Sequence, residues 1–126
     1  YPRVLLQAGL GDNVVPSLAA EALARAFNAS ILPNNPRQNI YGIQTESAAT
    51  EESLGPWVTL TELLYKKENA SLPASDNYNK LEVNAVHWCV REDLVMVSQV
   101  EEFINSGRIL DVCEHQGCIR EDTSHC

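Results

Sequence analysis

The sequence predicts an α/β fold, in which helices cover a β-sheet, from two strand-and-helix pairs. Near the start, the apolar run from Arg3 to Ala8 ends at Gly9, as in a strand that is buried on both faces. A helical pattern follows this strand. Later, the β-branched and aromatic run from Trp57 to Tyr65 precedes a second helical pattern. Strands that alternate with helices along the chain are typical of an α/β sheet.

The first helix is predicted to begin at Pro16 and Ser17 and to stop at Asn28. Glu21 lies in its early turns, where the helix dipole favours an anion. Residues at spacings of three and four form one apolar stripe, which we expect to pack on the sheet: Leu18, Ala22, Leu23 and Ala26. The turn from Gly9 to Asn13 is expected to use the conformational freedom of glycine.

The middle of the chain is predicted to contain one strand between irregular segments. The stretch from Ile31 to Ser53 is interrupted by proline and asparagine, and Trp57 to Tyr65 is interpreted as the strand. A short helix over Leu60 to Lys67 is the competing interpretation, because its leucines also fit one helical face. Lys66 to Lys80 is polar and is predicted to be a surface loop.

A long helix is predicted near the end of the chain. From Trp88 onward apolar residues recur every three to four positions, and Gly107 stops the pattern. Two strands cannot bury two such helices, so we expect most of the sheet to come from elsewhere. Tyr1 and Pro2 open almost directly into a buried strand, which suggests a processed chain or a piece of a longer one.

Length and charge exclude several classes of function. The chain has 126 residues, which is enough for one domain, and a formal net charge of −8. So negative a surface repels phosphate, which argues against a nucleic-acid partner and against docking on an anionic membrane. No apolar run approaches the ~20 residues of a transmembrane helix. No basic start followed by an apolar stretch occurs, so we expect no signal peptide. We divide the chain into a main part, residues 1–112, and a polar, cysteine-rich tail, residues 113–126.

The chain has four cysteines, three of them in the tail: Cys89, Cys113, Cys118 and Cys126. An even number clustered in this way suggests disulfides and an oxidising compartment. The favoured bridge is Cys113–Cys118, which closes a small loop. A zinc site that combines tail cysteines with His115 and His125 is the weaker alternative, since the tail lacks a paired C-x-x-C knuckle.

Two sequons for N-glycosylation begin at Asn28 and Asn69. Such short motifs also arise by chance. Together with the cysteines, they favour a secreted, periplasmic or otherwise extracellular protein.

Asp12 and His87 are the candidate catalytic residues. Asp12 follows a buried strand in a glycine-rich turn, at the edge of an α/β sheet where functional side chains project. In such a turn an aspartate often only binds nearby backbone N–H groups, and a histidine beside Trp88 is more often packed than catalytic. Together, however, they match two parts of a catalytic triad. The carboxylate orients the imidazole, and the imidazole takes and returns the proton of the nucleophile.

At these positions the chain resembles the C-terminal part of the α/β-hydrolase family, in particular secreted bacterial esterases and lipases. The likeness covers about residues 3–118. It rests first on a G-x-x-D-x-x-V-P pattern before a helix, formed by Gly9, Asp12, Val15 and Pro16. It rests second on the segment that ends at His87, which is followed by the last helix and the cysteine-bearing tail. In this family the nucleophile precedes the acid and the acid precedes the histidine. The resemblance implies that Asp12 is the acid and His87 the base.

The resemblance also implies what the rest of the enzyme supplies. Residues 1–112 would form the C-terminal part of an α/β-hydrolase domain, with about two strands and two main helices. No G-x-S-x-G motif occurs in the chain. The serine and the oxyanion hole are therefore expected in an N-terminal segment or a partner chain, without which this chain is inactive. Small esters or lipids are the expected substrates. No metal or organic cofactor is indicated, and triad chemistry needs none.

Other interpretations stay open. Cys89 lies two residues from His87 and is a conceivable nucleophile, but its position between Trp88 and Val90 favours a buried thiol or a disulfide with Cys126. The chain is alternatively a non-catalytic binding or structural subunit on a hydrolase-like scaffold. The charged run Arg91 to Asp93 is interpreted as solvated.

Overall fold

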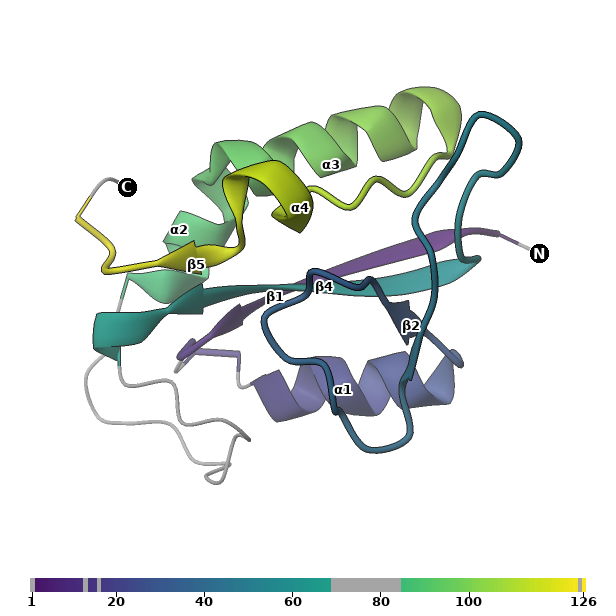
Figure 1. Cartoon of the computed structure of the whole chain (residues 1–126). Helices are drawn as coiled ribbons and strands as arrows, with labels where there is room; N and C mark the ends of the chain where they lie inside the picture. Colours follow the sequence, from purple (N-terminus) through teal and green to yellow (C-terminus); the bar gives the residue numbers. More distant parts are fainter. Residues whose placement is uncertain (1, 13, 16, 69–84, 125) are drawn as a thin grey trace.

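A parallel sheet separates two layers of helix (Figure 1). This computed structural model describes residues 2–12, 14–15, 17–68, 85–124 and 126. Helix α1 (Ser17–Ala26) packs on one face of the sheet, and α2 (Val86–Glu92) and α3 (Leu94–Ser106) lie over the other. The described strands all pair in parallel. The predicted α/β class is thereby confirmed.

Two long strands form most of the sheet. β1 (Val4–Leu10) and β4 (Val58–Tyr65) pair from Val4 opposite Val58 to Leu10 opposite Leu64. Three strands of two residues extend the sheet: β2 (Ser30–Ile31), β3 (Gln44–Thr45) and β5 (Ile119–Arg120). The order of the described strands is β1-β4-β2-β3, and β5 lies beside the end of β4. β1 is therefore an outer edge of the described sheet.

The strand predicted from Trp57 to Tyr65 is confirmed. The competing helix over Leu60 to Lys67 is not formed, and only a single 3₁₀ turn, η1 (Lys66–Glu68), follows the strand. β4 is a strand because it is paired along both edges, so its side chains alternate between the two layers. Leu60 packs with α1, and Leu63 packs with α2 and α3.

Helix α1 does not turn the predicted apolar stripe to the sheet. Leu23 is 50% exposed, and Ala22 and Ala26 are exposed as well. The buried positions of the helix are Ser17, Glu21 and Ala24. The reason is an ion pair across the layer, in which Arg37 Nη1 lies 2.8 Å from Glu21 Oε1. Apolar spacing does not reveal that the buried face of a helix carries a paired charge.

Asn28 ends α1, as predicted. Its φ of 52° is left-handed, its N–H donates to Arg25 O at 3.1 Å, and the N–H of Ala29 donates to Ala24 O at 2.8 Å. These two bonds satisfy carbonyl groups at the helix terminus, as in a Schellman motif. Asparagine is one of the few residues that adopt this conformation at low cost.

The single helix predicted from Trp88 to Gly107 is two helices. Asp93 separates α2 from α3 with an extended backbone, and its carboxylate accepts a hydrogen bond from Val95 N at 3.0 Å as the N-cap of α3. Apolar periodicity continues across this break, which is why the sequence pattern missed it. His87, predicted in the loop before the helix, lies in the first turn of α2. Gly107 ends α3 as predicted, with a φ of 73°.

The cysteine-rich tail is built into the fold. It contains the short helix α4 (Cys113–Gln116) and the strand β5, and it is held by the predicted disulfide Cys113–Cys118. A second disulfide, Cys89–Cys126, joins α2 to the end of the chain. Cys89, Cys113 and Cys118 are buried in the core between the sheet and α2. Among the described residues, no helix has the length and apolar character needed to span a bilayer.

Candidate active site at the carboxyl end of the sheet

Asp12 and His87 meet at the carboxyl end of the two long strands, β1 and β4. Asp12 follows β1 by two residues, and His87 begins the helix that comes after β4. Parallel strands end at the same edge of a sheet, so residues that follow them lie near one another. The Nδ1 atom of His87 is 2.9 Å from Oδ2 of Asp12. The two candidate residues are therefore in direct hydrogen-bond contact.

The Asp12 carboxylate is held from both of its oxygens. Oδ1 accepts hydrogen bonds from the backbone N–H groups of Val14 at 2.7 Å and Val15 at 3.0 Å, and Oδ2 faces His87. The side chain is 8% exposed. Asp12 binds the backbone of its own turn, as is common for an aspartate there, and it also binds a histidine from a distant element. The turn fixes the direction in which Oδ2 points.

His87 is partly buried, and one of its ring nitrogens forms a hydrogen bond with Asp12. Because an ionised carboxylate only accepts hydrogen bonds, Nδ1 carries the proton that is donated to Asp12. The ring packs edge-on against Trp88, with centroids 5.1 Å apart, and the side chain is 24% exposed. No hydrogen bond to Nε2 comes from the part of the chain that the structure describes. In the neutral imidazole with the proton on Nδ1, Nε2 is the nitrogen that can accept a proton.

Gly9 allows α2 to approach the sheet. A β-carbon added at Gly9 would lie 2.6 Å from Val86 Cγ1 and 2.7 Å from Val90 Cγ2, both on α2. The conformational freedom predicted for the turn from Gly9 to Asn13 is used by Gly11, which has a left-handed φ of 97°, whereas Gly9 still lies inside β1. The smallness of Gly9, rather than its flexibility, brings the first turn of α2 to Asp12.

A cavity of about 250 Å³ lies beside the pair. The residues that line it come from β1, α1, α2 and the Asp12 turn: Gln7, Ala8, Gly9, Asp12, Val15, Ala20, His87, Val90 and Arg91. Its walls are mostly small or apolar, and His87, Asp12 and Arg91 are its ionisable groups. Such a mixture of apolar walls and few polar groups is typical of a small-molecule site.

The cavity bends around the outer edge of β1. Ala8 and Ala20 belong to the layer that contains α1. Gln7 belongs to the other layer, since its Nε2 donates to Met96 O and to Gln99 Oε1 of α3, both at 3.0 Å. A space lined by residues of both layers must pass the edge of the strand between them. This edge of β1 pairs with no other described strand.

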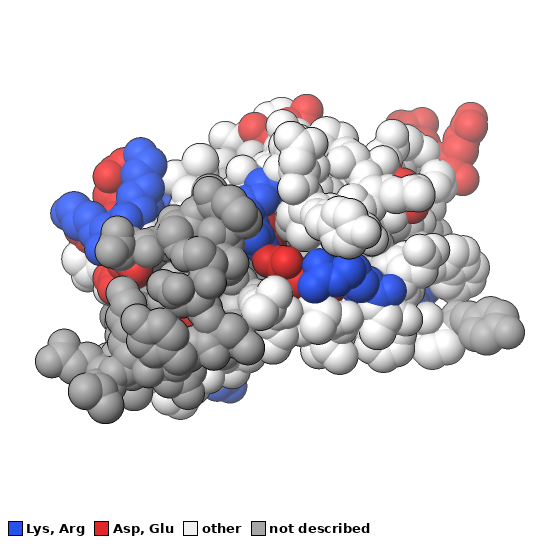
Figure 2. Space-filling view, turned by 90° about the horizontal axis from the view of Figure 1, so that it is seen from below, with Lys and Arg blue, Asp and Glu red and all other residues white. Residues whose placement is uncertain are grey.

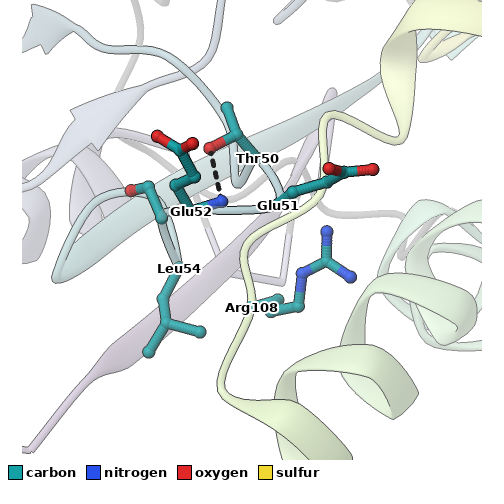
Figure 3. A pocket seen from close by; sticks show the side chains of 6 residues that line it. Thr50, Glu51, Glu52, Leu54 and Arg108 are labelled. Carbon is teal, nitrogen blue, oxygen red and sulfur yellow. Dashed lines mark hydrogen bonds between the residues drawn. The ribbon is translucent and has the colours of Figure 1, made fainter.

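A second and larger cavity, of about 340 Å³, is lined by the turn from Thr50 to Leu54 and by Arg108 (Figure 3). The turn is fixed by a hydrogen bond of 3.2 Å from Glu52 N to the Thr50 hydroxyl. It lies at the opposite end of the sheet from Asp12, because the carbonyl groups of Leu54 to Pro56 bind Arg3 ahead of β1. Its lining is largely exposed and contains no histidine or cysteine. We therefore place the candidate site at the smaller cavity.

A buried charge network lies on the α1 side of β4. Glu62 is fully buried and accepts hydrogen bonds from Arg37 Nε at 3.0 Å and from Asn35 Nδ2 at 3.0 Å. Burial disfavours the charge on Arg37, but the contacts with Glu62 and Glu21 outweigh it and raise the Arg37 pKa. Viewed from the α1 side, Lys and Arg side chains lie beside Asp and Glu side chains (Figure 2). The network fastens the segment that contains Asn35 and Arg37 to the central strand.

The remaining predicted site residues do not join Asp12 and His87. Cys89 is bonded to Cys126, so it is not a free thiol that could act as a nucleophile. With Cys113 and Cys118 also bonded to each other, none of the four cysteines is available as a zinc ligand. In the described part of the chain no cluster of three His, Cys, Asp or Glu residues could hold a metal ion. His125, of the zinc alternative, lies outside the described residues.

The predicted sequons fall in different parts of the chain. Asn28 is exposed at the end of α1, and Asn69 lies outside the described residues.

Sequence reasoning missed Arg91 as a site residue. It was interpreted as a solvated charge, and it is exposed, but it also lines the cavity one helical turn after His87. The spacing of four residues within a helix was the available signal, because residues i and i+4 share a face. Asp93 in the same charged run is not simply solvated either, since it caps α3 and binds Arg120 Nε at 2.8 Å.

Comparison of the chain with protein-family models, with curated proteins and with solved structures finds no match.

Proposed function

We propose that this chain supplies the acid and the histidine of a serine hydrolase that cleaves esters. Asp12 is the acid and His87 is the general base. The nucleophilic serine comes from an N-terminal segment or a partner chain, because no G-x-S-x-G motif occurs here. The single observation that carries the proposal is the contact of 2.9 Å between Asp12 Oδ2 and His87 Nδ1 beside a cavity.

The geometry supplies what a triad needs from these two residues. The hydrogen bond from Nδ1 to Asp12 fixes the tautomer of His87 in which Nε2 is a base. When Nε2 takes the proton of a serine hydroxyl, the ring becomes an imidazolium, and the adjacent carboxylate stabilises that charge. The backbone N–H groups of Val14 and Val15 keep the carboxylate in place while this happens.

The outer edge of β1 is the proposed docking place for the segment that carries the serine. The described sheet ends there, and the cavity beside His87 bends around this same edge. A strand added to the edge would place its own carboxyl end next to Asp12 and His87, provided that it runs parallel to β1. A serine after that strand could then come within hydrogen-bond reach of Nε2, about 2.6–3.2 Å.

We further propose an extracellular or periplasmic location and a small ester or lipid as substrate. The two disulfides fit an oxidising compartment. The volume of the cavity, about 250 Å³, fits a short acyl group better than a long chain.

Hydrolysis of 4-nitrophenyl butyrate by the full gene product, with its serine-bearing segment, tests the proposal. His87→Ala should reduce kcat/KM by about a thousandfold or more, and Asp12→Asn by a similar factor, because each removes one member of a triad. Both variants should keep the circular dichroism spectrum and the melting temperature of a folded protein to within a few degrees.

His115→Ala is the matched control. His115 is 87% exposed on α4, so its loss should leave both kcat/KM and the melting temperature unchanged. If the wild-type protein hydrolyses the ester and His87→Ala does not slow it, the catalytic assignment is wrong. A wild-type protein without any esterase activity would instead favour the binding or structural subunit.

A further inference from the structure

Arg91 differs from the other described cationic side chains in having neither a carboxylate nor a carbonyl acceptor among the described residues. Its guanidinium lies 5.5 Å from the centre of the Trp88 ring, a cation–π contact. No ion pair or hydrogen bond joins the Arg91 side chain to any residue in the described ranges. The Trp88 contact leaves the N–H donors of the guanidinium unused, since a ring face satisfies no hydrogen bond.

The other described Lys and Arg side chains form ion pairs or hydrogen bonds within the chain. Five of them have a carboxylate partner within 3.5 Å: Arg25, Arg37, Lys66, Lys67 and Arg120. Arg108 is 3.7 Å from Glu102, and Arg3 donates to three backbone carbonyl groups. Arg91 is exposed and has no such partner among the described residues, so its guanidinium is open to a ligand.

Arg91 also lies at the proposed active site. It lines the same cavity as His87, and the two residues share one face of α2 at a spacing of four. Side chains at this spacing have β-carbons about 5–6 Å apart. The other charged group of the cavity, Asp12, already binds His87 and two backbone N–H groups. Arg91 is thus the cationic group that a ligand meets in this part of the molecule.

We propose that Arg91 binds a carboxylate on the substrate, so that the enzyme prefers esters whose acyl group ends in an anion. This inference rests on the proposed function and adds the substrate class. A guanidinium presents several N–H donors in a fixed plane that matches a carboxylate. The apolar walls of the cavity, among them Val15 and Val90, hold the short chain between the ester and the anion.

A matched pair of substrates tests the inference with the full gene product. Mono(4-nitrophenyl) succinate and 4-nitrophenyl butyrate have the same leaving group and acyl chains of four carbons, and differ in the terminal carboxylate. Wild-type protein should show the higher kcat/KM for the succinate ester. Arg91→Ala should lower the succinate-to-butyrate ratio of kcat/KM by about 10- to 100-fold, the range expected for loss of a charged hydrogen bond. Most of the change should appear in KM.

Further variants separate a carboxylate site from a structural role. Arg91→Lys should retain part of the preference, and Arg91→Glu should reverse it so that the butyrate ester becomes the better substrate. Arg108→Ala, in the distant cavity, should leave both substrates unchanged. Preference for the succinate ester should also weaken at high salt, because a partly exposed ion pair is screened.

The outcomes distinguish this inference from the proposed function. Equal kcat/KM for the two esters in the wild-type protein, with hydrolysis still dependent on His87, overturns the carboxylate site alone. Loss of both activities in Arg91→Ala, together with release of the serine-bearing segment, also overturns it and assigns Arg91 to the contact with that segment. If no hydrolysis depends on His87, the proposed function itself is wrong.

Discussion

Gly9 of β1 and Val86 of α2 lie so close together that a β-carbon on Gly9 would be 2.6 Å from Val86 Cγ1. Cγ2 of Val90, one turn further along α2, would be 2.7 Å from the same added β-carbon. Both valines are buried. This contact determines how closely the helix that carries His87 approaches the strand that leads to Asp12.

Gly9→Ala should therefore push α2 away from β1. We expect a loss of about 1–3 kcal/mol in the free energy of unfolding, the usual cost of overpacking a core. The contact between Asp12 and His87 should weaken as well. Urea denaturation measures the first effect, and the shift of the His87 Nδ1–H proton resonance reports the second.

A double-mutant cycle provides the control. In a Val86→Ala, Val90→Ala background the methyl groups that would clash are gone, so Gly9→Ala should cost much less than in the wild-type protein. An equal cost in both backgrounds would show that Val86 and Val90 are not what excludes a β-carbon at Gly9.

The buried ion pair between Arg37 and Glu62 is the basis of a second prediction. Arg37→Met leaves the fully buried Glu62 without its cation, which should cost about 3–5 kcal/mol in the free energy of unfolding. Arg25→Met is the matched control. Arg25 is 32% exposed and 3.4 Å from Glu21, so its loss should cost about 1 kcal/mol or less. Similar costs in the two variants would contradict a dominant role for the buried pair.

The extent of sequence prediction differs between elements for physical reasons. β1, the end of α1 at Asn28 and the end of α3 at Gly107 follow from local residue types, and the structure contains each of them. β2, β3 and β5 have two residues each, too few for a periodic pattern. They are strands only because a neighbouring strand supplies their hydrogen bonds.

The residues of the candidate site, too, could be predicted only in part from the sequence. Asp12 and His87 could be selected from their places after a strand and before a helix, and the structure brings them together. The spacing of four from His87 indicates a shared helix face, but it does not by itself select Arg91, because charged residues near a helix end are usually solvated. Its significance depends on two facts that only the fold supplies, namely the cavity and the absence of a carboxylate partner in the described part of the chain. The burial of Glu21 on α1 was missed for a similar reason, since its partner Arg37 lies outside the helix.

The two disulfides should stabilise the protein to different degrees. Cys89–Cys126 joins residues 37 positions apart, and Cys113–Cys118 joins residues 5 apart. By the loop-entropy relation, their loss should cost ~4 and ~2 kcal/mol respectively. Thermal melts of Cys89→Ala/Cys126→Ala and Cys113→Ala/Cys118→Ala check this order. A larger loss in the second variant would indicate that the small loop contributes by local packing rather than by restricting the unfolded chain.

Tyr65 should make the protein sensitive to alkali. Burial, helped by the charge of Asp93, raises the pKa of Tyr65 to about 12, while Arg120 acts in the opposite direction. The unfolded chain releases the phenol proton near pH 10, so between pH 10 and about 12 unfolding releases a proton. Stability that is present below pH 10 should therefore be lost as the pH rises through this window.

Tyr65→Phe should remove this part of the alkaline loss. The Tyr65 hydroxyl is buried and has no hydrogen-bond partner among the described residues, so its removal should leave stability at pH 7 unchanged or slightly higher. The difference in urea midpoint between Tyr65→Phe and wild type, followed from pH 9 to 11, isolates the effect of this group. Tyr41→Phe, at a side chain that is 92% exposed, is the control and should follow the wild-type curve.

Covalent labelling of the full gene product with a fluorophosphonate shows whether Asp12 and His87 activate a serine, because this probe reacts with an activated serine. We expect that labelling occurs, that the labelled peptide lies outside the 126 residues of this chain, and that Asp12→Asn and His87→Ala abolish it while His115→Ala does not. Labelling that persists in folded His87→Ala protein, or a labelled serine within residues 1–126, would contradict the claim that Asp12 and His87 activate a serine supplied from elsewhere.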